Sequence, residues 1–172
     1  TGYSDSDWAR CKKTAKSTSG GVIQRGSHHI RSWSSTQKCV TLSSGEAELI
    51  ALVRTSTEVI GVIQLAADWG LQMEGEVLAD SAAALGVVKR KGCGKLRHDR
   101  VGQLRVQEKE STGELGYRKV KGEANPADAG TKYLSESKMS QFMETVLQEA
   151  LGGRAETSLR VAGEEKGEKQ KR

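Results

Sequence analysis

Apolar residues recur at helical spacing in the first half of the chain. Ser43, followed three residues later by Glu46, forms a capping-box signature that predicts the start of a helix. From there the apolar positions repeat along one face, ending near Trp69-Gly70: Leu49, Leu52, Val53, Ile60, Ile63 and Ala67. Gly61 within this run costs about 1 kcal/mol relative to alanine, so packing on a sheet must hold the helix.

Short β-prone runs bounded by turn residues predict strands on both sides of this helix. Before it we expect three antiparallel strands, at 2–8, 21–24 and 29–33, with a turn at Gly26-Ser27 joining the last two. After it we expect a strand at 76–79, helices at 81–88 and 98–109, and a strand at 114–120. This order predicts a mixed α/β fold, with a five-stranded mixed sheet flanked by helices.

The last part of the chain predicts helices at 125–133 and 135–151. The second has one apolar stripe, made by Met139, Phe142, Met143, Val146 and Leu147, and Gly152-Gly153 ends it. We therefore expect one domain over 1–134, an amphipathic helix at 135–151 packed on or beside it, and a charged, disordered tail at 152–172. The first residue is Thr, which suggests a piece of a longer chain.

Composition narrows the function classes. Hydrophobic residues make up 35% of the 172, with one Phe, so the core must come mainly from Val, Leu, Ile and Ala. The net charge of +5 fits a polyanionic partner but is weak support for one. The widely spaced cysteines favour reduced thiols over zinc or disulfides. We expect no membrane span and no signal peptide, hence an intracellular protein.

Acidic residues lie in four short segments, each at the end of a predicted element or in its first turns. They are Asp5 and Asp7, Glu46 and Glu48, Asp80, and Asp128. Each residue alone is more often an ordinary solvated or capping side chain. Their positions in this strand–helix order are what indicate a shared site.

Six strings carry a resemblance to a known family. They are GYSDSDW, KSTSGGV, SWSSTQKCVTLSSGEAELIAL, LADSAAAL, LRHDRV and NPADAGTK. In this order they resemble the ribonuclease H domain of copia-type (Ty1/copia) LTR retrotransposon Pol polyproteins, over residues 1–134. The resemblance implies the ribonuclease H-like fold and cleavage of the RNA strand of RNA–DNA hybrids.

The resemblance also implies a site of four carboxylates, which hold two Mg²⁺ or Mn²⁺ ions: Asp5, Glu48, Asp80 and Asp128. Hard cations prefer carboxylate oxygens, and two ions can activate a water and stabilise the leaving oxygen. We prefer Glu48 to Glu46, because Glu46 fits the capping box whereas Glu48 begins a row that continues through Leu52 toward the sheet. Asp7 is expected at the rim.

Basic and polar residues in the loops are weaker candidates for substrate contacts: Lys12, Lys13, Lys16, Ser81, Lys95, Arg97 and His98. Loop charges are usually only solvated, and Ser81 can simply begin a helix. His28 and His29 are expected in a hairpin turn, exposed to solvent.

The chain also departs from cellular ribonucleases H. These often carry a histidine loop before the last catalytic aspartate, whereas the short segment 120–125 has Glu123 at that place. No basic, Trp-bearing handle helix is visible. Both differences predict slow turnover in the isolated domain without affecting the metal chemistry.

The leading hypothesis is a ribonuclease H acting in retrotransposon reverse transcription. Its expected partners are an RNA–DNA hybrid and the reverse transcriptase part of the same polyprotein, in a cytoplasmic virus-like particle or in the nucleus. The alternative is an inactive nucleic-acid-binding or structural remnant. An integrase or resolvase is weaker, because it would need another late acidic residue in place of Asn-Pro-Ala-Asp128.

Overall fold

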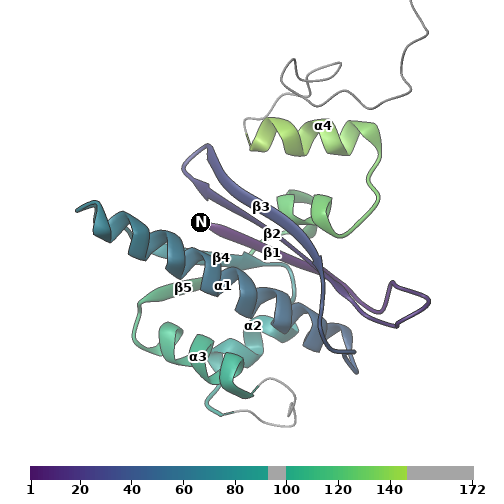
Figure 1. Ribbon diagram of the computed structural model, residues 1–172, viewed down its shortest axis with the longest axis horizontal. Helices are drawn as coiled ribbons and strands as arrows, with labels where there is room; N and C mark the ends of the chain where they lie inside the picture. Colours follow the sequence, from purple (N-terminus) through teal and green to yellow (C-terminus); the bar gives the residue numbers. More distant parts are fainter. Residues whose placement is uncertain (93–99, 147–172) are drawn as a thin grey trace, which may run out of the picture.

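A computed structural model describes residues 1–92 and 100–146. Its sheet has five strands in the order β3-β2-β1-β4-β5 (Figure 1). The antiparallel strands are β1 (Gly2–Asp7), β2 (Thr18–Arg25) and β3 (His28–Thr36). On the other side of β1, β4 (Gly75–Ala79) and β5 (Leu115–Lys119) are added in parallel. The predicted fold class is confirmed, and a strand lies at each of the five expected places.

The long helix α1 (Ser44–Asp68) packs across this sheet and supplies much of the core. Leu49, Leu52 and Val59 are at most 3% exposed, and they pack with Val77 of β4 and Leu115 of β5. One half of the predicted capping box is present, because the Ser43 side chain accepts a hydrogen bond from the Glu46 backbone N–H. The Glu46 carboxylate accepts from the Leu42 N–H in place of the Ser43 N–H. Gly61 lies within this helix, which packs on the sheet as expected from the sequence.

The expectation that no stretch is long and apolar enough to span a membrane was wrong. By length and composition alone α1 passes such a test: it has 25 residues, and a stretch of 18 residues within it has a mean hydropathy of 1.5. A helix packed into a protein core passes the same test. Because one side of α1 packs against β1, β2 and β4, burial in the core accounts for its apolar composition.

Two further helices lie with α1 on one side of the sheet, α2 (Ala82–Lys89) and α3 (Arg100–Ser111) (Figure 1). Leu85 and Val88 of α2 and Val106 of α3 join the same core. Both helices agree with the sequence prediction. The second was predicted from residue 98, and positions 98 and 99 lie outside the described residues. Ser81 begins α2, since its side chain accepts the backbone N–H of Ala84 at 3.2 Å.

The predicted helix at 125–133 was wrong in kind. The chain instead forms two 3₁₀ turns, η1 (Gly122–Ala124) and η2 (Pro126–Gly130). Asn125 explains the break: it has extended backbone, and its side chain donates to the Ser4 carbonyl at 2.9 Å. Its side-chain oxygen also accepts the Ala127 N–H, so Asn125 fixes η2 against β1.

The last described helix, α4 (Glu136–Thr145), packs against η2 on the other side of the sheet from α1 (Figure 1). Phe142 and Val146 of the predicted apolar stripe are buried, whereas Met139 is 38% exposed. Leu147, the end of the predicted helix and the charged tail lie outside the described residues.

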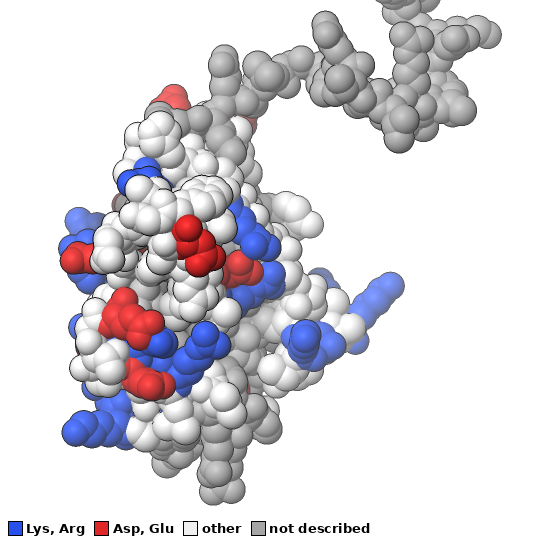
Figure 2. Space-filling model, turned by 60° about the vertical axis from the view of Figure 1, so that its left-hand side comes forward, with Lys and Arg blue, Asp and Glu red and all other residues white. Residues whose placement is uncertain are grey.

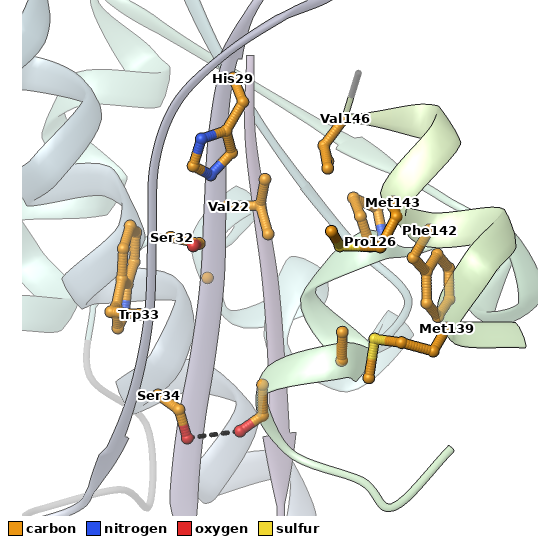
Figure 3. A pocket seen from close by; sticks show the side chains of 13 residues that line it. Val22, His29, Ser32, Trp33, Ser34, Pro126, Met139, Phe142, Met143 and Val146 are labelled. Carbon is orange, nitrogen blue, oxygen red and sulfur yellow. Dashed lines mark hydrogen bonds between the residues drawn. The ribbon is translucent and has the colours of Figure 1, made fainter. Parts of the chain in front are cut away.

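An apolar hollow of about 270 Å³ separates α4 from β2 and β3 (Figure 3). Val22, Phe142 and Met143 line it, and His29 points into it from β3. The predicted turn placement was wrong for both histidines, because the turn ends at Ser27 and β3 begins at His28. His28 is exposed, as expected, whereas His29 is half-buried.

Candidate active site

The central strand β1 carries Asp5 at the middle of the acidic cluster, where its side chain is 1% exposed. Asp5 is paired with Gly20 of β2. A Cβ atom on Gly20 would lie 2.6 Å from the Ala127 carbonyl oxygen, so only glycine lets η2 approach this closely. This approach brings Thr131 into contact with Asp5, to whose carboxylate the threonine hydroxyl donates.

The start of α1 presents Glu48 to the same point. Glu46 is used otherwise: its Oε2 accepts the Leu42 backbone N–H at 2.7 Å, while Ser43 caps the helix. Glu46 thus serves the start of α1, as the capping interpretation expected, although its partner is the N–H of Leu42 and not that of Ser43. Glu48 is half-buried, and among the described residues its Oε2 is a buried oxygen without a hydrogen-bond partner.

The third acid, Asp80, directly follows β4, the parallel neighbour of β1. One carboxylate oxygen from each of Asp5, Glu48 and Asp80 lies within 4.8 Å of the others. Parallel strands end at the same edge of a sheet, and the N-terminal part of α1 reaches that edge. The topology thus gathers residues that are far apart in sequence.

The fourth predicted acid, Asp128, lies in η2 outside this group of three. A lysine connects it to the cluster: Lys132 Nζ is 2.9 Å from Asp128 Oδ1 and 3.5 Å from Asp5 Oδ1. The structure therefore brings Asp128 beside the cluster with an ammonium group between it and Asp5.

These carboxylates are electrostatically costly in the absence of a cation. Burial, with the charges of Asp128 and Asp80, raises the pKa of Asp5 to about 6, against the hydrogen bond from Thr131. Burial, with the charges of Asp5 and Asp80, raises the pKa of Glu48 to about 8. Burial alone would lower the pKa of Lys132. The hydrogen bond to Asp128 and the negative charges of Asp5 and Asp128 outweigh this effect, so the pKa of Lys132 is raised. The cluster as a whole favours a bound positive charge.

Sequence comparison finds relatives among retrotransposon polyproteins. The chain is 32% identical over 147 residues to the retrovirus-related Pol polyprotein from transposon TNT 1-94 of Nicotiana tabacum, a match covering 84% of the chain. It is 42% identical over 72 residues, 41% of the chain, to the polyprotein from transposon RE1 of Arabidopsis thaliana. The chain spans 11% and 5% of these polyproteins, respectively. No protein-family model matches it.

Structure comparison finds ribonucleases H. LC11-RNase H1 in complex with an RNA/DNA hybrid has 21% sequence identity and a TM-score of 0.52, over 76% of this chain and 91% of that one. A second LC11-RNase H1 structure has 19% identity and a TM-score of 0.54, over 86% and 96%. This chain is a homologue of copia-type Pol polyproteins. Its fold is that of ribonuclease H.

The donor set of this ribonuclease H-like domain fits a hard divalent cation. All three grouped ligand atoms are carboxylate oxygens, which Mg²⁺ and Mn²⁺ prefer. A bound divalent cation would give the unpartnered buried oxygen of Glu48 a partner and would favour the charged forms of Asp5 and Glu48, whose pKa values are raised.

The weaker candidates divide into three groups. Lys12 and Lys13 are exposed and Lys16 half-exposed, all in the β1–β2 connection. Ser81 caps α2 beside Asp80. Lys95, Arg97 and His98 lie outside the described residues. Their contacts with substrate stay predictions.

Sequence reasoning missed Thr131 and Lys132, both of which contact Asp5. They follow Asp128 by three and four residues, which in a helix is a spacing of about one turn. That spacing was the available signal that their side chains lie on the same face as Asp128. Asp7, expected at the rim, accepts the Thr18 backbone N–H at 2.6 Å and lines a groove that Thr131 and Lys132 also line.

Proposed function

We propose that this domain is a metal-dependent endoribonuclease that cleaves the RNA strand of RNA–DNA hybrids during retrotransposon reverse transcription. The observation that carries the proposal is the meeting of Asp5, Glu48 and Asp80 within 4.8 Å at one edge of a ribonuclease H fold. The relatives' description as Pol polyproteins supports a reverse transcriptase as partner. A cytoplasmic virus-like particle or the nucleus is the corresponding location.

Asp5, Glu48 and Asp80 would hold the cation, and Asp128 would complete a site for two ions. Bound Mg²⁺ or Mn²⁺ supplies the charge that activates water and stabilises the leaving oxygen in phosphodiester hydrolysis. The protein's own contribution is to fix the ligands. Thr131 orients the Asp5 carboxylate, and Asn125 fixes η2, which carries Asp128, against β1.

Overall charge supports nucleic-acid binding only weakly. On the face drawn in Figure 2, basic and acidic side chains lie side by side. Phosphate contacts from the exposed lysines of the β1–β2 connection, Lys12 and Lys13, are part of the proposal. They predict binding that weakens as salt concentration rises.

The rival function is an inactive nucleic-acid-binding remnant. The presence of all four acids favours activity, since a remnant needs no costly buried carboxylates. The test is cleavage of a labelled RNA–DNA hybrid in Mg²⁺ and in Mn²⁺. Asp80→Asn should lower the single-turnover rate more than about 100-fold, since losing a ligand costs more than losing a residue that supports one. An Asp80→Asn protein as fast as the parent, or an inactive parent that binds hybrid, would refute the proposal.

A further inference from the structure

A groove of about 450 Å³, lined by both polar and apolar side chains, lies beside the acidic cluster. Thr131 and Lys132, which contact Asp5, also line this groove. Arg10, from the β1–β2 connection, and Tyr133, which follows Lys132, complete its basic and aromatic wall. The groove therefore begins where the acidic cluster ends, and a strand leaving the cluster in this direction would enter it.

Arg10 and Tyr133 form a stacked pair in the groove. The guanidinium carbon lies 4.6 Å from the centre of the tyrosine ring. Arg10 Nη1 donates to the Thr131 carbonyl at 2.7 Å, which fixes the guanidinium. A guanidinium has five N–H donors, so this bond leaves most of them for another acceptor.

Tyr133 is 95% exposed although one ring face lies against Arg10. The other face is therefore open to solvent, and the side chain contributes little to the core. An aromatic ring held by a cation and open on one side is the arrangement on which unpaired nucleobases stack.

We propose that the Arg10–Tyr133 pair is a binding subsite for a single-stranded segment of nucleic acid that continues from the hybrid. An unpaired base would stack on the open ring face, and its phosphates would contact Arg10 and Lys132. Within a duplex the faces of the bases are already covered, so an exposed ring selects a single strand or a strand end. The inference rests on the proposed function, because the acidic cluster is what places the hybrid beside the groove.

Charge within the groove is mixed, and this limits where phosphates can lie. Asp7 lines the same groove, and its Oδ1 accepts the Thr18 N–H. A phosphate is repelled by Asp7, so the backbone of the strand is expected on the Arg10 and Lys132 side. The competing account is that the pair only anchors the β1–β2 connection to the segment after η2.

The test is equilibrium binding, measured by fluorescence anisotropy in EDTA so that no strand is cut. One probe is a blunt RNA–DNA hybrid, and the other is the same hybrid with a short single-stranded tail. For the parent protein the tail should lower Kd about 5-fold or more, which corresponds to about 1 kcal/mol of stacking. Tyr133→Ala should bring the ratio of the two Kd values close to one, and Tyr133→Phe should keep the parent ratio because the ring remains.

Trp69→Ala is the matched control, since Trp69 is a 72% exposed aromatic at the opposite end of α1 from Glu48. It should keep the parent ratio. The inference is overturned if the tail gives the parent no gain, if Tyr133→Ala keeps the gain, or if Tyr133→Phe loses it. The proposed function is tested separately: it fails if the parent protein does not cut the blunt hybrid in Mg²⁺.

Discussion

Lys132 forms ion pairs with two carboxylates: its Nζ lies 2.9 Å from Asp128 Oδ1 and 3.5 Å from Asp5 Oδ1. The ammonium thus occupies the space between the fourth predicted ligand and the central one. Two negative charges so close need a cation, and in the metal-free protein the lysine provides it. A divalent ion that used both carboxylates would have to replace this ammonium.

The first prediction follows from this competition. Lys132→Gln should destabilise the metal-free protein by about 1 kcal/mol or less, because the lysine is partly exposed and its ion pair is screened by solvent. The same change should tighten the binding of Mg²⁺ or Mn²⁺ several-fold. Calorimetric titration gives the affinity and thermal unfolding in EDTA gives the stability.

The matched control is Lys109→Gln, which removes the Lys109–Glu114 ion pair beside β5 without touching the acidic cluster. Its metal affinity should equal that of the parent. If Lys132→Gln binds metal no more tightly than Lys109→Gln, the lysine does not compete with the ion.

The second prediction separates the two glutamates of α1. In Glu46→Gln the amide oxygen can still accept the Leu42 N–H, so hybrid cleavage should change little. Glu48→Gln should lose most cleavage by weakening metal binding. It should not destabilise the metal-free protein at pH 7, because the carboxylate that it replaces has a raised pKa and is costly to ionise. Cleavage rates and melting temperatures, measured side by side, check both; equal losses of cleavage at matched stability would contradict the assignment.

The order of helices and strands could be predicted because the spacing of hydrophobic residues and the turn residues determine secondary structure through contacts between neighbours in the sequence. The capping box at Ser43 and the row from Glu48 to Leu52 placed one glutamate at the helix start and the other toward the sheet, and the structure agrees with both placements. The helix predicted at 125–133 was wrong because long-range bonds of Asn125 to β1 override local preference.

Lys132 could be assigned only in part: its spacing of four residues from Asp128 indicated that pair, but not its contact with Asp5. A lysine in a charged motif is usually solvated, and only the fold brings its Nζ between Asp128 and Asp5. Similarly, the Arg10–Tyr133 contact joins residues more than a hundred positions apart, and no local pattern indicates it.

The third prediction concerns pH. The carboxyl pKa values of Asp5 and Glu48 are raised by folding, from 3.8 to about 6 and from 4.5 to about 8. Between these limits the folded protein binds more protons than the unfolded chain, so the stability from these groups is full below about pH 4 and is lost as pH rises to about 8. The metal-free protein should therefore melt at a lower temperature at pH 8 than at pH 5.

The control is the Asp5→Asn, Glu48→Gln double variant, in which neither group titrates. Subtracting its melting curve across pH from that of the parent removes the contribution of all other groups. A difference that stays flat or rises with pH would refute the shifts. Adding Mg²⁺ should stabilise the parent more at pH 8 than at pH 5, since the ions bind the deprotonated carboxylates.

The last prediction concerns Glu123, for which the sequence resemblance implied the place of a histidine in cellular ribonucleases H. Glu123 is exposed in η1, and it lines a hollow together with Asp128. The neighbouring residue, Gly122, is close enough that a Cβ atom there would lie 3.2 Å from Asp80 Oδ2, so the loop already touches the acidic cluster. An exposed carboxylate is repelled by a scissile phosphate unless a metal lies between them.

We expect Glu123→Ala to keep the parent single-turnover rate within about 3-fold, a change of less than 1 kcal/mol in the barrier. Steady-state turnover should be slow in both proteins. A collapse of the single-turnover rate to that of Asp80→Asn would instead make Glu123 an additional metal ligand, and the set of four acids would be incomplete.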